Sequence, residues 1–396
     1  MVLTVLLLRH IMLLMHTVAI ERAETYEPEL IRQAVHRLLA PLGGMSAFVR
    51  PGERVLLKPN MLSAKSPEQA VTTHPELLRA VIREVQAIGA VALVGDSPGI
   101  GSMRRVAEKS GMLAVIEETG ATLAPFDAVR EVAASGVFKR FQVAKAYLDA
   151  DRLINLPKLK THEMMTLTCG VKNLFGAVVG AEKPAWHLKA GADRALFARM
   201  LLELYQLRIP ELTLVDGVVA MEGNGPGNGD PRSMGLLLAG ANPVAVDVIA
   251  AELAGMPKQL LHVERAAERL GLPGADRAGI ETVGEPLAAI QVPPFRLPPM
   301  ADVQFGLPGI IKNRLRNQLS TRPVQLSERC KLCGICVAAC PPRAIRIEGG
   351  RLRFDYQKCI RCFCCRELCP DAALGVREGW LLRLLSRRRG KKGGSH

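Results

Sequence analysis

Aromatic side chains are scarce in this chain, because Phe, Trp and Tyr together make up 4% of its 396 residues. Proteins that bind single-stranded nucleic acid stack the bases on aromatic side chains, so we expect no nucleic-acid partner. The chain also lacks a continuous run of roughly 20 apolar residues, the length needed to span a bilayer. We therefore expect a cytoplasmic protein without a transmembrane helix.

Cysteine is nearly absent from the first 300 residues, where Cys169 is the only one. The remaining cysteines all lie between Cys330 and Cys369. A disulfide scaffold would spread its bridges over the whole fold. Clustering at short fixed intervals indicates metal ligation in a reducing, low-oxygen compartment, because oxidised thiols do not hold iron.

The cysteines form two runs with the spacing C-x2-C-x2-C-x3-C-P, which is typical of bacterial two-cluster ferredoxins. In this arrangement the first three cysteines of a run hold one cluster and the fourth ligates the other. We therefore predict two 4Fe-4S clusters. One is assigned to Cys330, Cys333, Cys336 and Cys369, and the other to Cys359, Cys362, Cys365 and Cys340. A zinc site would need two pairs of ligands rather than two sets of three plus one.

Cys364 is an extra cysteine within the second run. It is either a small buried residue or an alternative ligand in place of Cys365.

The C-terminal region is strongly basic, because the chain from Phe305 to its end has 20 Lys and Arg against 6 Asp and Glu. Part of this excess offsets the negative charge of the clusters. The basic tail, 377–396, is either solvated or contacts an acidic electron-transfer protein, RNA or the anionic surface of a membrane.

Short apolar runs alternate with longer helical stretches between Thr17 and Leu287, which indicates an α/β fold. We expect a mostly parallel sheet with helices on both faces, followed by a small α+β ferredoxin-like domain. The expected strands are 17–20, 54–57, 90–94, 152–155, 212–215 and 236–238. The expected helices are 28–39, 75–88, 103–119, 195–207, 244–253 and 259–270.

Composition divides the chain into five segments. Met15 directly precedes the first expected strand, so residues before it are interpreted as a dispensable extension or a mis-assigned start. Prolines and basic residues predict a linker before the cysteines. The predicted segments are the extension 1–15, the α/β domain 16–290, the linker 291–323, the two-cluster domain 324–376 and the tail 377–396.

Several phrases in the large domain carry a resemblance to a known family. They are Val55–Asn60, Thr73–Pro75, Gly95–Gly99, Leu156–His162, Gly170–Gly176, Asp216-Gly217 and Asn242–Asp247. The chain from about Thr17 to Met256 resembles the family called domain of unknown function 362, which is often joined to a ferredoxin module of this kind.

Polar residues follow the expected strands of the large domain, and the carboxyl ends of parallel strands converge on one crevice. We expect a shared pocket there. Its lysines suit an anionic small molecule, and a histidine beside a carboxylate suits proton transfer. The predicted catalytic residues are His162, Lys160, Lys172 and Asn173. The predicted substrate-binding residues are Lys58, Asn60, Asp96, Ser97, Lys158, Asp216 and Glu222, with His74, His187 and Asp247 as further candidates.

Each of these residues also has a plainer interpretation, since a lysine at a strand end is usually solvated and Asp247 is placed to cap a helix. Three hypotheses for function follow. The first is an oxidoreductase that relays single electrons from the clusters, supplied by a partner protein, to an anionic substrate in the pocket. The second is an accessory electron carrier or maturation factor that docks on another enzyme. The third is a non-redox isomerase or ligase with structural clusters.

Overall fold

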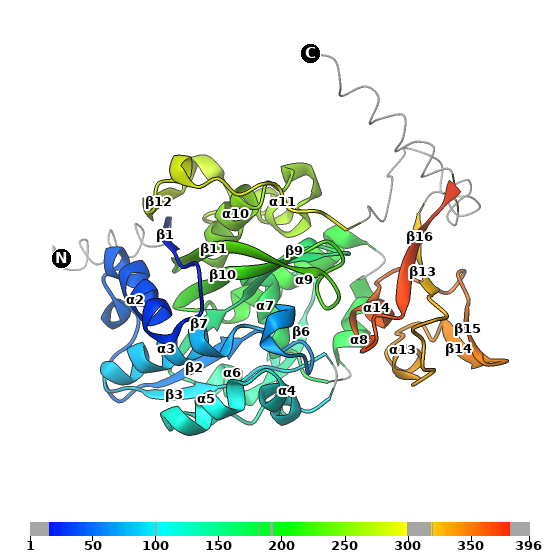
Figure 1. The fold of residues 1–396 in the computed structure, drawn as a ribbon, viewed down its shortest axis with the longest axis horizontal. Helices are drawn as coiled ribbons and strands as arrows, with labels where there is room; N and C mark the ends of the chain where they lie inside the picture. The colour runs from blue at the N-terminus through cyan, green and yellow to red at the C-terminus, as the bar shows by residue number, and fades with distance from the viewer. Residues whose placement is uncertain are drawn as a thin grey trace, which may run out of the picture.

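The computed structural model describes residues 16–99, 101–180, 182–190, 193–298, 318 and 320–380. The predicted extension, most of the predicted linker and residues 381–396 of the predicted tail lie outside these ranges. A large α/β unit and a smaller cysteine-rich unit lie side by side (Figure 1). The predicted fold class is confirmed. Within the described ranges, no helix combines the length and the apolar character that crossing a bilayer requires.

A ten-stranded sheet forms the centre of the large unit, with the main order β12-β1-β11-β10-β7-β2-β3-β4. Neighbours from β10 to β4 are parallel, whereas β11 runs antiparallel to both β10 and β1. The parallel strands are β2 (Arg54–Pro59), β3 (Val91–Val94), β4 (Thr122–Leu123), β7 (Arg152–Leu156) and β10 (Leu212–Glu222). The other side of the sheet contains β1 (Thr17–Arg22), β11 (Asp230–Gly240) and β12 (Glu281–Gly284).

Helices cover both faces because successive side chains of a strand point in opposite directions. Val55 and Leu57 of β2 pack against the first group of helices, whereas Leu56 packs against the second. The first group is α2 (Pro28–Leu39), α3 (Pro75–Ala87), α4 (Met103–Lys109) and α5 (Met112–Thr119). The opposite face carries α6 (Lys145–Asp149), α9 (Arg194–Leu207), α10 (Pro243–Leu253) and α11 (His262–Arg269).

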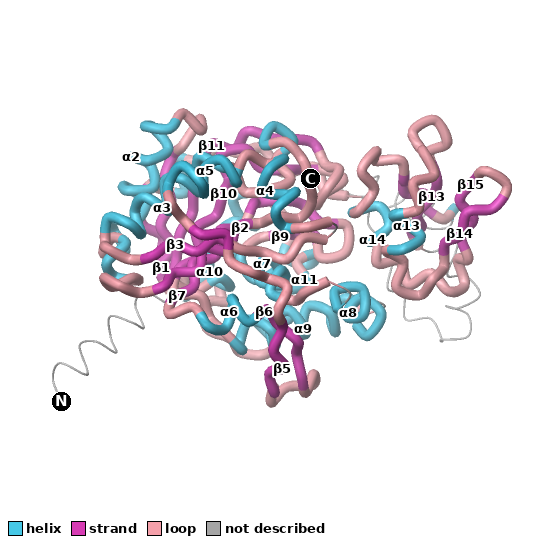
Figure 2. The backbone as a smooth tube through the Cα atoms, turned by 90° about the horizontal axis from the view of Figure 1, so that it is seen from below, coloured by secondary structure: helices cyan, strands magenta, loops and turns pink. Residues whose placement is uncertain are grey.

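Two details differ from the prediction. The single helix expected at 103–119 is interrupted at Gly111, whose φ of 76° lies in the left-handed region and ends the helical geometry. The hairpin of β5 (Val129–Ala133) and β6 (Arg140–Ala144) was not expected, and it projects from the large unit in Figure 2.

The segment that leads to the pocket was also unexpected. Pro157 separates β7 from β8 (Lys158–His162), which pairs with β10 on one side and with β9 (Thr166–Thr168) on the other. The short helix α7 (Gly170–Asn173) follows directly, and α8 (Glu182–Ala190) lies after a tight turn. This compact series of turns places six polar residues of the region around one cavity, namely Lys160, Thr168, Lys172, Asn173, Lys183 and His187.

The cysteine-rich unit consists of two strand pairs and two short helices. β13 (Thr321–Gln325) pairs with β16 (Leu374–Glu378), and β14 (Ile345–Glu348) pairs with β15 (Arg351–Phe354). The helices are α13 (Ile335–Ala338) and α14 (Cys364–Glu367). Figure 1 shows α14 on the side of this unit that faces the large one, close to α8.

Candidate functional site

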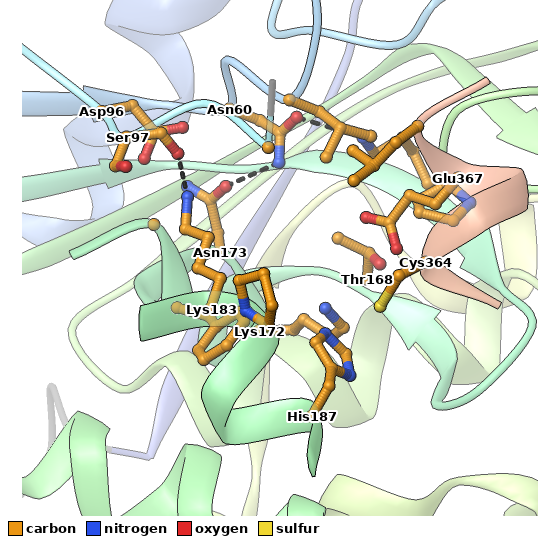
Figure 3. Close-up of a pocket in the computed structure, with 18 of the residues that line it drawn as sticks. Asn60, Asp96, Ser97, Thr168, Lys172, Asn173, Lys183, His187, Cys364 and Glu367 are labelled. Carbon is orange, nitrogen blue, oxygen red and sulfur yellow. Dashed lines mark hydrogen bonds between the residues drawn. The ribbon is translucent and has the colours of Figure 1, made fainter. Parts of the chain in front are cut away.

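A cavity of about 90 Å³ lies where the large unit meets the cysteine-rich unit (Figure 3). Six of the predicted site residues line it, namely Asn60, Asp96, Ser97, Lys160, Lys172 and Asn173. The candidate His187 lines it as well. Because roughly 10–15 Å³ of such space holds one water molecule, the cavity has room for several waters or for a small ligand group.

Beneath the cavity, Lys58 and Asp96 form an ion pair with an Nζ to Oδ1 distance of 2.8 Å. Both residues are buried, and burial lowers the pKa of Lys58 while the Asp96 carboxylate acts in the opposite direction. The second oxygen of Asp96 accepts the Met61 amide at 2.8 Å. A Cβ at Gly176 would overlap Asp96 Oδ1, so the glycine allows this close approach. Lys58 is therefore a neutralised support rather than a free cation.

A chain of side-chain amides forms the adjoining wall. Asn60 donates to Asn173 at 2.9 Å, and Asn173 in turn donates to Asn155 Oδ1 at 2.9 Å. Lys160 donates to Asn60 Oδ1 at 3.0 Å and to the Val71 carbonyl at 2.7 Å. Burial lowers the pKa of Lys160 to about 7. Near neutral pH, Lys160 can therefore exchange a proton while its position stays fixed by two hydrogen bonds.

Lys172 and Lys183 face the cavity from helices α7 and α8. Lys172 Nζ lies 5.6 Å from the centre of the Phe175 ring and, within the described part of the chain, makes no hydrogen bond. Lys183 donates to the carbonyl oxygens of Ser97 and Pro98, and burial lowers its pKa to about 8. Lys172 is thus the lysine most available to a ligand.

Two buried histidines lie in this region. His162 Nδ1 accepts the Met164 amide at 3.0 Å and the Met165 amide at 3.2 Å, which assigns its proton to Nε2. Burial lowers the pKa of His162 below its ordinary value and that of His187 to about 3. Both rings are therefore neutral at physiological pH. His162 does not line the cavity itself, but the charge of Lys172 acts on it.

Three other predicted residues belong to clusters away from the cavity. Lys158 pairs with Asp216 at 3.0 Å, and the Tyr26 hydroxyl lies 2.5 Å from Asp216 Oδ1. Glu222 binds Arg232 and Arg296, each at 2.7 Å. The structure does not bring these acids and Lys158 together with Lys160 and Lys172 around one pocket.

Asp247 and His74 also lie outside the cavity lining. Asp247 accepts the amides of Gly170 at 2.5 Å and of Val171 at 3.0 Å. These bonds fix the start of α7, which carries Lys172 and Asn173. His74 stacks on Tyr26 with ring centres 3.5 Å apart. Asp247 thus positions α7 without lining the cavity itself.

The cysteine-rich unit contributes its own residues to the cavity, and the sequence argument did not place them there. Cys364 and Glu367 of α14 line it together with Leu368. Thr168 and Lys183 of the large unit are likewise new. The doubled cysteine at 364 and 365 was the signal available for α14, because the second run departs from the first at this position.

Several contacts hold α14 against the large unit. Arg366 forms an ion pair with Glu163, and its carbonyl accepts Asn228 Nδ2 at 2.8 Å. Lys65 donates to the Pro370 carbonyl at 2.9 Å. A Cβ at Gly227 would lie 2.7 Å from the Glu367 carbonyl, so only glycine allows this approach.

The surroundings of the cysteines are consistent with the two groups assigned from the sequence. Cys330, Cys333, Cys336 and Cys369 line a second, smaller cavity. Cys340 is close enough to Cys362 and Cys359 for their charges to raise its pKa, to which burial contributes most, and the same two cysteines act on Cys365. Thiolates in groups of four are the donor set of a 4Fe-4S cluster.

The two runs also repeat each other in backbone geometry. Left-handed residues occur at equivalent positions, with φ of 54° at Leu332 and 59° at Arg361, then 76° at Gly334 and 58° at Phe363. The Ala344 amide donates to Cys340 Sγ, and the Ala373 amide donates to Cys369 Sγ, both at 3.2 Å. Amides directed at sulfur suit negatively charged thiolates, so the donor set and its surroundings fit iron–sulfur clusters.

Comparisons with known proteins match the large unit and the cysteine-rich unit to two different families. The family described as "Domain of unknown function (DUF362)" matches residues 55–252, and the "4Fe-4S dicluster domain" matches 322–370. Thylakoid-associated protein sll1697 of Synechocystis sp. is 38% identical over 302 residues, which cover 76% of this chain and 94% of that protein. Pyruvate synthase subunit PorD of Methanocaldococcus jannaschii is 37% identical over 70 residues, 17% of this chain and 81% of that subunit.

Among solved structures, the lactate racemase apoprotein of Thermoanaerobacterium thermosaccharolyticum is similar with a TM-score of 0.40 and 11% identity. The match covers 61% of this chain and 58% of that one. With a TM-score this low, the similarity supports no conclusion about function.

Proposed function

Because this chain belongs to the DUF362 family and has a ferredoxin-type 4Fe-4S dicluster domain, we propose that it transfers single electrons to an anionic small molecule held in the cavity between the two units. Two bound 4Fe-4S clusters would supply the one-electron chemistry. The activity proposed is therefore that of an iron–sulfur oxidoreductase.

One observation carries this proposal: the cavity has lysines on one side and α14 on the other. Cys364 and Glu367 line the cavity. Cys364 directly precedes the proposed ligand Cys365, and the lining residue Ala339 directly precedes the proposed ligand Cys340. A ligand in the cavity would thus lie beside the cluster held by Cys340, Cys359, Cys362 and Cys365. A structural cluster would not need to adjoin a lysine-lined cavity.

The proposed roles follow from how each side chain is held. Lys172 Nζ binds the anionic group, because it makes no hydrogen bond to the described part of the protein. Lys160, with a pKa of about 7, donates or accepts a proton near neutral pH. Asn173 keeps Asn60, and through it Lys160, in place. His162 presents its Nε2 proton from a ring whose orientation is fixed by two amides.

The first test is an EPR spectrum of the anaerobically isolated protein after reduction with dithionite. Two reduced clusters within one small domain broaden each other's signals, so we expect the spectrum of a spin-coupled pair. An isolated cluster signal, or clusters that dithionite does not reduce, would contradict the proposal and favour structural clusters.

A further inference from the structure

The end of the cavity nearest α14 contains polar atoms without partners. Within the described residues, Thr168 Oγ1 and His187 Nδ1 have no hydrogen-bond partner, although only 4% of Thr168 and 6% of His187 is exposed. Both residues line the cavity. Burying a polar atom without a partner costs roughly 1–3 kcal/mol, so two such atoms facing one cavity indicate that a ligand supplies the partner.

These two atoms lie beside a cation. Figure 3 shows Thr168 of β9, Lys172 of α7 and His187 of α8 around the same cavity. A hydroxyl, an ammonium group and a neutral imidazole with its proton on Nδ1 are all hydrogen-bond donors. The ligand group that accepts from three donors at once is an oxyanion.

The cysteine-rich unit contributes a carboxylate, that of Glu367, to the same cavity. Glu367 projects toward Thr168 and Cys364 in Figure 3 and lines the cavity. It forms no direct ion pair with a described lysine, yet its charge acts on Lys160, Lys172 and Lys183. A bound oxyanion would therefore be attracted by Lys172 and repelled by Glu367. Both effects grow in proportion to the ligand's charge, so Glu367 offsets part of the attraction by Lys172, and the energy that it offsets is twice as large for a dianion.

We propose that Lys172, Thr168 and His187 form an oxyanion subsite for the acidic group of the ligand, and that the carboxylate of Glu367 shifts the preference of this subsite from doubly toward singly charged groups. This deepens the proposed function by naming the residues that hold the acidic group of the molecule in the same cavity. Glu367 is a specificity-determining residue that the cysteine-rich unit contributes to a site in the α/β unit.

The rest of the cavity lining indicates which kind of group is attached to the acidic group of the ligand. Its lining includes the apolar side chains of Leu62, Phe175, Pro184 and Leu368. These surfaces suit an apolar or aromatic group attached to the acidic group. Benzoate and phenyl phosphate are therefore matched probes, because they share a ring and differ in the charge of the acidic group.

The test is anaerobic calorimetric titration of the oxidised, cluster-loaded full chain with each probe. At about pH 7.5 the phosphate ester is mostly a dianion, because its second pKa lies near 6. We expect the wild type to bind both probes. In Glu367→Gln, affinity should rise about threefold for benzoate and about tenfold for phenyl phosphate, since the removed repulsion is doubled for the dianion. Glu348→Gln, an exposed glutamate of β14, is the control and should change neither affinity.

Two further variants test the donors. Thr168→Val and His187→Phe keep the shape of each side chain, and each should weaken benzoate about tenfold through the loss of one hydrogen bond to a charged group. An unchanged preference in Glu367→Gln, unchanged benzoate affinity in both donor variants, or no binding of either probe would overturn the proposal. No electron is transferred in this experiment, so its failure is distinct from a failure of the redox proposal, which the EPR spectrum reports.

Discussion

Lys58 and Asp96 form a buried ion pair of 2.8 Å directly beneath the cavity. The pair joins the carboxyl ends of β2 and β3, because Lys58 belongs to β2 and Asp96 follows β3. Asp96 also holds the Met61 amide, so one carboxylate orients both the lysine and the loop after β2. The loop that carries Asn60 depends on this arrangement.

Asp96→Asn should therefore destabilise the protein strongly. The substitution leaves the Lys58 ammonium buried without its counter-charge, and breaking a buried pair in this way costs roughly 3–5 kcal/mol. Urea unfolding followed by circular dichroism measures the loss. Asp149→Asn is the matched control, because Asp149 pairs with Arg130 on the surface and such pairs contribute about 0–1 kcal/mol. Equal losses in the two variants would show that the buried pair is not the support described here.

Acid should destabilise the fold partly through His187. Burial lowers the folded-state pKa of His187 to about 3, whereas an unfolded histidine titrates near 6.5. Below about pH 6.5 the unfolded state therefore binds a proton that the folded state does not, and stability falls by up to about 1.4 kcal/mol per pH unit. This contribution is present above pH 6.5 and is lost progressively toward the folded pKa.

The variant His187→Phe isolates this contribution. Its free energy of unfolding should depend less steeply on pH between about pH 6.5 and 5 than that of the wild type, by about one proton. Replacement of the exposed His36 by Gln is the control and should leave the wild-type slope unchanged. If His187→Phe has the wild-type slope, His187 is not a neutral buried ring.

Replacing the cysteines one at a time should distinguish the two clusters from each other. Cys330 and Cys359 belong to different groups of four, so Cys330→Ala and Cys359→Ala should each lower the iron content by about half and abolish spin coupling in the reduced protein. Cys364→Ala should keep the full iron content, because the two groups are complete without it. If Cys364→Ala loses iron and Cys365→Ala does not, the ligand is Cys364.

Asp247→Asn should weaken the support of α7. The carboxylate accepts two amides, and an asparagine would direct its own N–H groups at one of them. We expect a loss of about 2 kcal/mol in the free energy of unfolding together with weaker benzoate binding, because Lys172 lies on this helix. Asp276→Asn is the control: Asp276 caps a short exposed turn, and asparagine is an equally good cap. If benzoate affinity is unaltered in Asp247→Asn, then Asp247 does not position Lys172.

The sheet could be predicted from the sequence because its central strands are buried on both faces. Val55–Leu57 is a continuous apolar run, which is typical of such strands. β8 and β9 were missed because their lysines and threonines are polar and still buried. The burial of Lys158 and Lys160 depends on partners far away in the sequence, Asp216 and Asn60, which no local pattern reveals.

The candidate site was partly predictable because the ends of parallel strands lie at one edge of the sheet. Strand ends bring Asn60, Asp96 and Lys160 to one edge, as a parallel sheet requires. Lys158 and Asp216 separate from them because the pairing of β8 with β10 is irregular after Asp216. Glu367 could not be predicted, since its position depends on how the cysteine-rich unit docks on the large one.

The central claim is that the cavity adjoins one particular cluster. The most direct test is an EPR-monitored redox titration of the holo-protein with and without benzoate, repeated in Cys330→Ala and Cys359→Ala. An anion in the cavity should lower the potential of the cluster held by Cys340, Cys359, Cys362 and Cys365, on the order of tens of millivolts. The shift should persist in Cys330→Ala and be absent in Cys359→Ala. A shift of equal size in both variants, or none in Cys330→Ala when benzoate is bound, would contradict an electron path from this cluster to the cavity.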